Sequence, residues 1–304
     1  MTLLQLLTYV SLVIFGIGIA RTAIKYVKMP IHLRWELYPV AHEKGRDYGG
    51  SYFENLDWWT KPRKKSLLGE IKFMIPEILL IRTLFHHNRK LWNASFPFHG
   101  GLYLLMGLLG LILIGAVVQA FGVAVSPESS SRLVTLLYYV TVLIGFAGLT
   151  SALWGCARLL FTRFTDEDLK ICSTPLDYIN LFFILAVLLS ALNAWLFVDN
   201  GFIMAREYIQ SLITLKSFST TSLAVKVEII LLALFMIYFP FTHMTHMFTK
   251  YFTYHKVRWE DEPNIRGEEI EARVKAVLQR NVSWAAPHIP TGKKWSEIAK
   301  ENNE

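Results

Sequence analysis

Five long apolar runs constrain this chain more than any other feature of its sequence. They cover residues 3–20, 98–121, 133–160, 178–197 and 227–241, and most approach the roughly 20 residues that a helix needs to cross a bilayer. Because lipid offers no hydrogen bonds to exposed backbone groups, such runs cross a membrane as helices. With 53% hydrophobic and 18% charged residues, the sequence predicts an all-α integral membrane protein with a five-transmembrane-helix bundle.

Basic residues predict the orientation of the bundle. Segments 28–97, 162–177 and 250–304 hold 24 Lys and Arg residues, whereas segments 122–132 and 198–222 hold three. Basic loops favour the cytoplasmic side, so we expect the N-terminus outside and the C-terminus in the cytoplasm. The net charge of +7 suits anionic lipid head groups or an acidic partner, and no motif points to nucleic acid.

The sequence divides into a membrane domain at residues 1–250 and a cytoplasmic tail at 251–304. Within the long cytoplasmic loop, residues 67–92 are predicted to form an interfacial helix, because charges and a proline interrupt their apolar pattern. The tail contains a candidate amphipathic helix at 268–279. Because glycine and proline interrupt the rest, we expect the tail to have no core of its own and to dock on a partner.

Histidines at the ends of two runs are the main candidate ligands. His243 and His246 follow the last run three residues apart, a spacing that predicts one face of a continuing helix. His99 lies at the start of the second run, after Pro97, which we expect to begin that helix. An imidazole at membrane depth is costly without a partner, so these residues predict a ligand site.

A haem site is the favoured interpretation of these histidines. His99 and His246 are expected at the same membrane depth on two different helices, and two neutral imidazoles can hold the iron of a b-type haem. The sequence lacks Cys-x-x-Cys-His, which excludes c-type attachment, and it lacks Cys-x-x-Cys, so any iron–sulfur cluster belongs to another subunit. A zinc or copper site at His243 and His246, and plain interhelical hydrogen bonding, are the alternatives.

Several neighbouring residues have two interpretations each. Glycines near His99 would either admit a flat macrocycle or allow close helix packing; they are Gly100, Gly101, Gly107 and Gly110. His86 and His87 form either a solvated helix end or part of a second haem or quinone site. Asn180, on the fourth run, is expected to make a hydrogen bond between helices.

These features resemble the membrane cytochrome b subunits of the respiratory nitrate reductase gamma type. The resemblance rests on the five spans, on Phe98-His99 in the second, and on Phe239-Pro-Phe-Thr-His-Met-Thr-His246 closing the fifth. The membrane subunit of heterodisulfide reductase and the DsrM protein are relatives. The loop at residues 35–43, with Trp-Glu-Leu-Tyr-Pro and His-Glu, looks closest to the cytochrome b subunit of the Tmc complex of sulfate reducers.

The resemblance implies a haem b-containing membrane subunit of a respiratory redox complex, in a bacterial or archaeal cytoplasmic (inner) membrane. Such a subunit transfers electrons between the menaquinone pool and a cytoplasmic iron–sulfur (heterodisulfide-reductase-like) subunit. A periplasmic multihaem cytochrome c and other membrane subunits are further partners that it suggests. The chain would then carry electrons within a complex, without being an enzyme alone. The alternative is a haem-free, quinone-binding membrane anchor subunit.

The family pattern also assigns ligands, since it uses two histidines on each of two helices to bind two stacked haems. His99 and His246 match the pair for the haem nearer the cytoplasm. The outer pair would fall at Leu109 and Glu228, neither of which is an imidazole. The resemblance therefore implies at least one haem. Without the outer haem, there is no basis for the quinone site that the family usually has beside it. The remaining histidines could rebuild a second, inner haem: His243 with His86 or His87.

Overall fold

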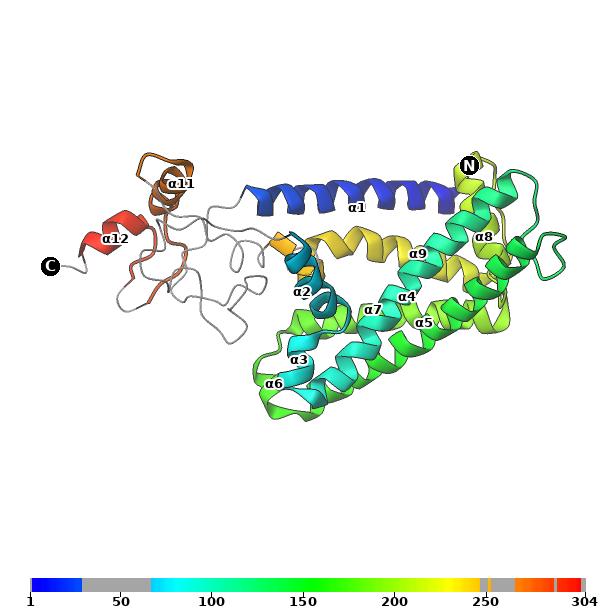
Figure 1. Cartoon of the computed structure of the whole chain (residues 1–304), viewed down its shortest axis with the longest axis horizontal. Helices are drawn as coiled ribbons and strands as arrows, with labels where there is room; N and C mark the ends of the chain where they lie inside the picture. The colour runs from blue at the N-terminus through cyan, green and yellow to red at the C-terminus, as the bar shows by residue number, and fades with distance from the viewer. Residues whose placement is uncertain (1, 29–66, 247–250, 253–265, 287–288, 302–304) are drawn as a thin grey trace. The chain divides into compact units, whose positions relative to one another are not determined.

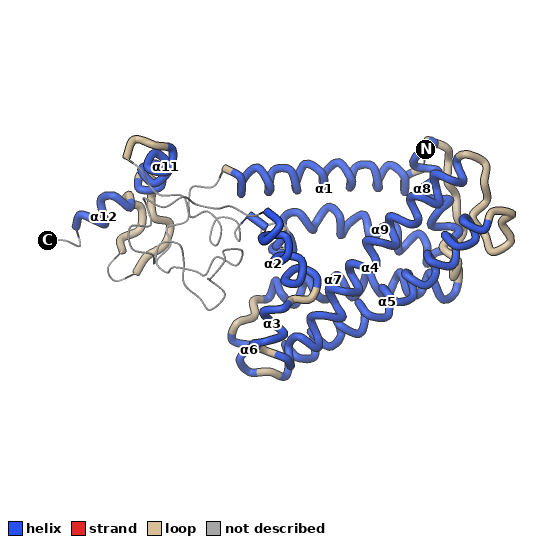
Figure 2. The backbone as a smooth tube through the Cα atoms, viewed as in Figure 1, coloured by secondary structure: helices blue, strands red, loops and turns tan. Residues whose placement is uncertain are grey.

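The computed structural model describes residues 2–28, 67–246, 251–252, 266–286 and 289–301. Within these ranges the regular structure is helical, apart from two isolated bridges in the tail (Figures 1 and 2). The chain divides into two compact units. The first unit contains Met1–Ile19 and Met74–Thr245, and the second contains Ala20–Phe73 and His246–Glu304.

Among the described residues, five helices are long and apolar enough to cross a membrane, which agrees with the predicted all-α fold and its five candidate spans. Each extends beyond its apolar run at one end or both, because polar residues continue the helix where the run stops. They are α1 (Leu3–Val27), α4 (Arg89–Ala120), α5 (Arg132–Thr165), α7 (Pro175–Phe197) and α9 (Leu223–Tyr238), which a short 3-10 helix, η3 (Phe239–Phe241), continues.

Shorter helices lie before, between and after these spans. The predicted amphipathic helix of the tail is confirmed as α11, with nearly the same bounds. The set comprises α2 (Leu67–Leu79), α3 (Arg82–His87), α6 (Glu167–Ile171), α8 (Ile203–Thr214), α11 (Glu269–Leu278) and α12 (Trp295–Glu301).

The predicted interfacial helix is wrong as a single element. Its residues form α2, α3 and the first turn of α4, and Ile81 between α2 and α3 adopts a left-handed conformation with φ of 51°. Two side chains of α4 donate to carbonyls at the end of α2 or just after it: Trp92 Nε1 to Leu80 (2.8 Å) and the Tyr103 hydroxyl to Ile78 (2.9 Å). These bonds satisfy carbonyls that the helix break leaves without a partner.

The second span begins earlier than the sequence predicts. Helix α4 starts at Arg89, where the side chain of Asn88 caps it by accepting a hydrogen bond from the Leu91 backbone N–H at 2.9 Å. Pro97 therefore lies inside the helix, where it removes one backbone donor without ending the helix. As a result, His99 lies several turns from the true start of α4.

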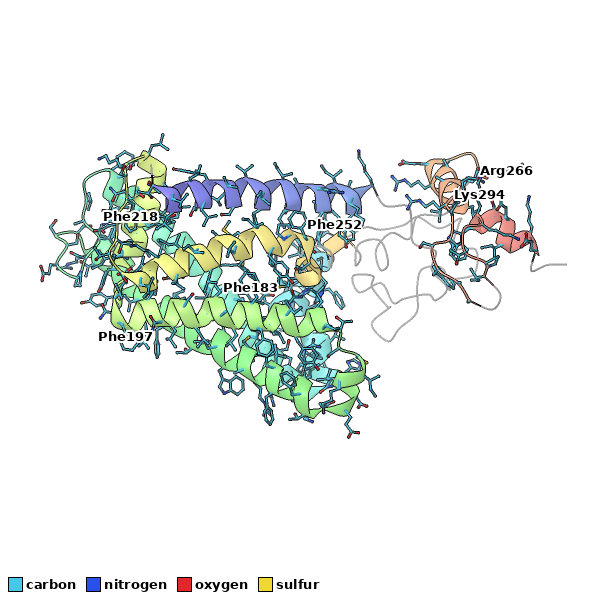
Figure 3. All side chains as sticks on the ribbon, turned by 180° about the vertical axis from the view of Figure 1, so that it is seen from behind. Phe183, Phe197, Phe218, Phe252, Arg266 and Lys294 are labelled. Atoms are coloured by element: carbon cyan, nitrogen blue, oxygen red, sulfur yellow. The ribbon has the colours of Figure 1, made fainter. Side chains whose placement is uncertain are left out.

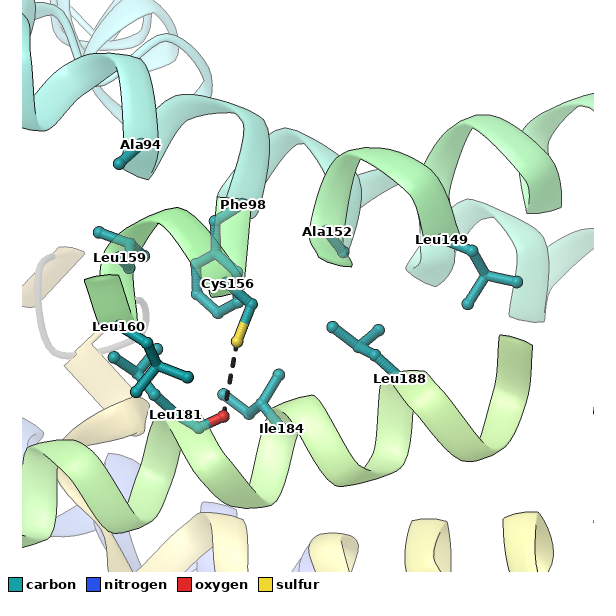
Figure 4. Close-up of a cluster of buried hydrophobic side chains, with 10 residues drawn as sticks. All are labelled: Ala94, Phe98, Leu149, Ala152, Cys156, Leu159, Leu160, Leu181, Ile184 and Leu188. Atoms are coloured by element: carbon teal, nitrogen blue, oxygen red, sulfur yellow. Dashed lines mark hydrogen bonds between the residues drawn. The ribbon is translucent and has the colours of Figure 1, made fainter. Parts of the chain in front are cut away.

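Two glycines bring α4 and α5 into close contact. A Cβ on Gly101 would lie 2.3 Å from the backbone nitrogen of Ala152, and a Cβ on Gly155 would lie 2.3 Å from that of Phe98. Any larger residue at either position would push the two backbones apart. Buried apolar side chains of α4, α5 and α7 surround this contact and form the main core (Figure 4).

Buried polar groups hold α8 at the opposite end of the bundle. The Asp199 carboxylate accepts hydrogen bonds from the backbone N–H groups of Ile203 (2.6 Å) and Ala205 (2.9 Å) and so caps the helix. The Arg206 guanidinium is fully buried, and this desolvation lowers its pKa. Its Nη2 donates to the Val125 carbonyl at 3.2 Å, which ties α8 to the loop after α4.

The tail has a small core, so the expectation that it would have none is wrong. Val282, Ile289 and Ile298 are buried together, with Ala286 and Trp295 packed against them. Two antiparallel bridges bring these residues together by pairing Asn281 with Lys294 and Ala286 with Ile289.

Gly155→Ala should destabilise the bundle, because the new Cβ must separate α4 from α5. Overpacking of this kind costs about 1–3 kcal/mol, which corresponds to a loss of several degrees in the midpoint of thermal unfolding. The measurement is thermal unfolding of the full-length protein in detergent. Gly16→Ala on α1 is the matched control, since a Cβ there meets nothing within 4 Å. Equal midpoints for both variants would contradict the close contact.

Candidate functional site

The five candidate histidines lie in three places. His99 is on α4, and His86 and His87 end α3. His243 begins a second 3-10 helix, η4 (His243–Thr245), and His246 follows it directly. All of them except His246 belong to the first compact unit.

His99 is held in one tautomer by its own helix. Its Nδ1 lies 2.8 Å from the backbone carbonyl of Ser95, one turn earlier, and 3.2 Å from the Ser95 hydroxyl. A carbonyl oxygen only accepts, so Nδ1 carries the proton and the lone pair of the neutral ring lies on Nε2. This arrangement is typical of metal-binding histidines, whose second nitrogen is fixed by a hydrogen bond.

The glycines of α4 divide into two faces. Gly101 packs against α5, whereas a Cβ added to Gly100, Gly107 or Gly110 would meet nothing within 4 Å. The close-packing interpretation of these three glycines is therefore wrong within the described residues. Together with the fixed tautomer of His99, the open strip fits a flat, metal-containing ring beside α4.

The last span ends before the histidines that follow it. Helix α9 stops at Tyr238, η3 contains Pro240, and Thr242 is extended with φ of −116° and ψ of 167°. Proline supplies no N–H to continue the helical hydrogen bonds, which explains why α9 ends here. His243 and His246 therefore do not lie on a continuation of α9, and that part of the prediction is wrong.

His243 instead faces α7. Its Nε2 lies 3.1 Å from Oδ1 of Asp177 and 3.3 Å from Nδ2 of Asn180. Because a carboxylate oxygen accepts, the contact with Asp177 favours a proton on Nε2. The Tyr238 hydroxyl donates to Oδ1 of Asn180 at 2.8 Å, so the prediction that Asn180 links two helices is confirmed.

Asp177 is a site residue that the sequence-based prediction missed. Its other oxygen, Oδ2, accepts hydrogen bonds from the backbone N–H and the hydroxyl of Thr174, both at 2.8 Å, and so completes a capping box for α7. A Thr-Pro-Leu-Asp sequence predicts this cap whether or not a histidine faces it. Only the folded structure brings His243 to Asp177 and so gives this carboxylate a second role.

His87 makes the same kind of bond to its own helix as His99, but at the exposed end of α3. His86 and His87 are exposed, and Nδ1 of His87 lies 2.8 Å from the Thr83 carbonyl in its own helix. His246 is exposed and belongs to the second compact unit, so its pairing with His99 stays a prediction. Over the described ranges, no group of three or more His, Cys, Asp or Glu side chains could hold a metal ion.

Comparison with known proteins identifies the family. The sequence model of the nitrate reductase gamma subunit matches residues 82–260, which is more than half of the chain and includes all five candidate histidines. No curated protein and no solved structure matches the chain. Because this match covers more than half of its length, the chain belongs to the nitrate reductase gamma subunit family and is a membrane subunit of the cytochrome b type in a multi-subunit redox complex.

Proposed function

We propose that this chain binds haem b and passes electrons between menaquinone and a cytoplasmic iron–sulfur subunit, which resembles the heterodisulfide reductase type. The observation that carries the proposal is the fixed tautomer of His99 beside the open glycines of α4, within the matched family region. A periplasmic multihaem cytochrome c is a further candidate partner. The orientation, with the N-terminus outside, and the cytoplasmic (inner) membrane of a bacterium or archaeon belong to the same proposal.

His99 and His246 are the proposed axial ligands of the iron. His99 would offer Nε2, which the hydrogen bond from Nδ1 to Ser95 keeps unprotonated. Gly100 and Gly107 would let the ring approach the backbone of α4. The haem supplies a one-electron carrier, and the protein sets its position and its reduction potential.

One haem is proposed rather than two. The family pattern places the outer ligand pair at Leu109 and Glu228, and neither side chain can replace an imidazole. Leu109 is 52% exposed on α4, so this position also offers no buried ligand to the interior of the bundle. A second haem held by His243 with His86 or His87 is the rival arrangement. It would require His243 to leave Asp177.

Purified full-length protein should show the absorption bands of a b-type cytochrome in a reduced-minus-oxidised spectrum. Pyridine haemochrome analysis should give about one haem per chain, because the proposal assigns one pair of histidines to the iron. A value of about two would favour the rival arrangement with His243. A protein without haem would favour the alternative function, a quinone-binding membrane anchor.

His99→Ala and His246→Ala should each abolish the haem spectrum, because each removes one of the two axial ligands. The measurement is haem content per chain after purification from cells supplied with excess haem. Asn193→Ala on α7 is the control, since Asn193 is exposed and contacts none of the candidate histidines among the described residues. If His246→Ala retained full haem content, His246 could not be the ligand, and His243 would take its place.

A further inference from the structure

The contact between α7 and α9 joins hydrogen-bonding groups to aromatic rings. We call it the α7–α9 seam, and define it by Asp177, Asn180 and Phe183 on α7, Tyr238 on α9, and His243. The Phe183 and Tyr238 ring centroids are 5.4 Å apart, and Figure 3 labels Phe183 between the two helices. The Tyr238 hydroxyl donates to Oδ1 of Asn180, whose Nδ2 lies 3.3 Å from the same His243 nitrogen that faces Asp177. One short stretch of two helices therefore offers a ring surface next to polar groups.

The aromatic part of the seam continues along α9. The Phe183 ring meets the Phe235 ring edge-on, with ring centroids 5.6 Å apart. The ring centroids of Phe235 and Phe239 are 5.8 Å apart. Aromatic rings on successive helical turns often serve only to fill a core. Here the row ends at a carboxylate–imidazole pair, which a purely apolar contact does not need and which costs free energy to desolvate.

Exposure distinguishes the two members of that pair. The His243 side chain is 52% exposed, whereas Asp177 is only 17% exposed. The imidazole is therefore within reach of water and of a ligand that arrives from the lipid. The carboxylate behind it is held by the helix cap, so it can orient the ring and stabilise its positive charge.

We propose that Asp177 and His243 are a proton-exchange pair, which passes protons between water and the head group of a quinone bound at the α7–α9 seam. A quinone has an apolar ring, which the aromatic row can contact, and carbonyl oxygens, which need hydrogen-bond donors. The inference rests on the proposed function, because it uses the quinone and the haem named there. It places the quinone at the C-terminal end of α9. The family resemblance puts the lost outer haem at Glu228, which lies towards the other end of this helix.

The proton and electron balance follows from quinol oxidation. A quinol loses two protons and two electrons to become a quinone. Each proton passes from a quinol hydroxyl to Nδ1 of neutral His243, which becomes an imidazolium, and then to water. The Nε2 proton stays on the ring and is donated to Asp177 throughout, so the carboxylate remains ionised. A bound haem would accept the two electrons one at a time and pass the first to the proposed iron–sulfur subunit before it takes the second, and quinone reduction is the reverse.

Other charged and titratable groups around the pair come from the neighbouring helices. Arg163, near the end of α5, lies close enough to Asp177 for its charge to act on the carboxylate. Its guanidinium is held by a hydrogen bond to the Ser173 hydroxyl, and its backbone carbonyl accepts from Tyr178. Tyr238 faces the pair from α9.

The test is the rate at which a reduced short-chain naphthoquinone reduces the haem of the full-length protein in native membranes. In the wild type, the rate should rise with pH across the range in which the protein stays folded, because only a neutral imidazole can accept a proton. His243→Gln should keep its haem, lose this pH dependence, and react about 100-fold more slowly at the upper end of the range. Asp177→Asn, which retains an oxygen for the helix cap, should slow the reaction in the same way.

Two further variants separate the chemistry from binding and from folding. Phe183→Leu should raise the quinol concentration for half-maximal rate by about 3- to 10-fold, and leave the pH dependence in place, because it removes only ring contact. Asp168→Asn is the matched control for Asp177→Asn, since Asp168 is an exposed carboxylate on α6 outside the seam. Its rate and pH profile should equal those of the wild type.

The outcomes are distinguishable from those that test the proposed function. A wild-type protein without haem would refute the proposed function. If the wild type contains haem but His243→Gln loses it, His243 is an iron ligand and the proton-exchange pair is wrong. If His243→Gln keeps both its haem and the wild-type rate and pH profile, the seam plays no part in proton transfer. The inference then falls, and the cytochrome b function stands.

Discussion

The close contact between α4 and α5 is the constraint on which the candidate haem site depends. Gly155 admits the backbone of Phe98, and Gly101 admits that of Ala152, so α4 can take only one rotation about its axis. Each residue of a helix turns by about 100° from the one before. Once Phe98 points into α5, His99 and Gly100 must face elsewhere. The helix–helix contact thus selects the face on which His99 and the open glycines lie.

A second constraint acts where α9 ends. Pro240 and the extended Thr242 stop the helix and redirect the chain, and His243 then faces α7. A continuing helix would have carried His243 along the axis of α9, with no reason to meet Asp177. The backbone break therefore brings His243 into a pair with Asp177.

Much of the fold could be predicted because the bilayer imposes a simple rule on sequence. Five apolar runs of sufficient length became five helices, and Asn180 made the expected bond between helices. Helix ends were predicted less well. The start of α4 at Arg89 depends on the Asn88 cap, and the end of α9 depends on how Pro240 is accommodated. Such local hydrogen bonds compete within a few residues, and hydropathy does not register them.

By itself, the sequence determined the helical class, the five runs long enough to span a membrane and the set of candidate histidines, because these follow from residue type and run length. The bond from His99 to Ser95 is local to α4. Only the tertiary structure decided that His243 faces Asp177, since this contact depends on α7 lying beside the end of α9. Asp177 acquired its second role in the same way. Contacts between segments distant in sequence arise from packing, which the local pattern of residues does not specify.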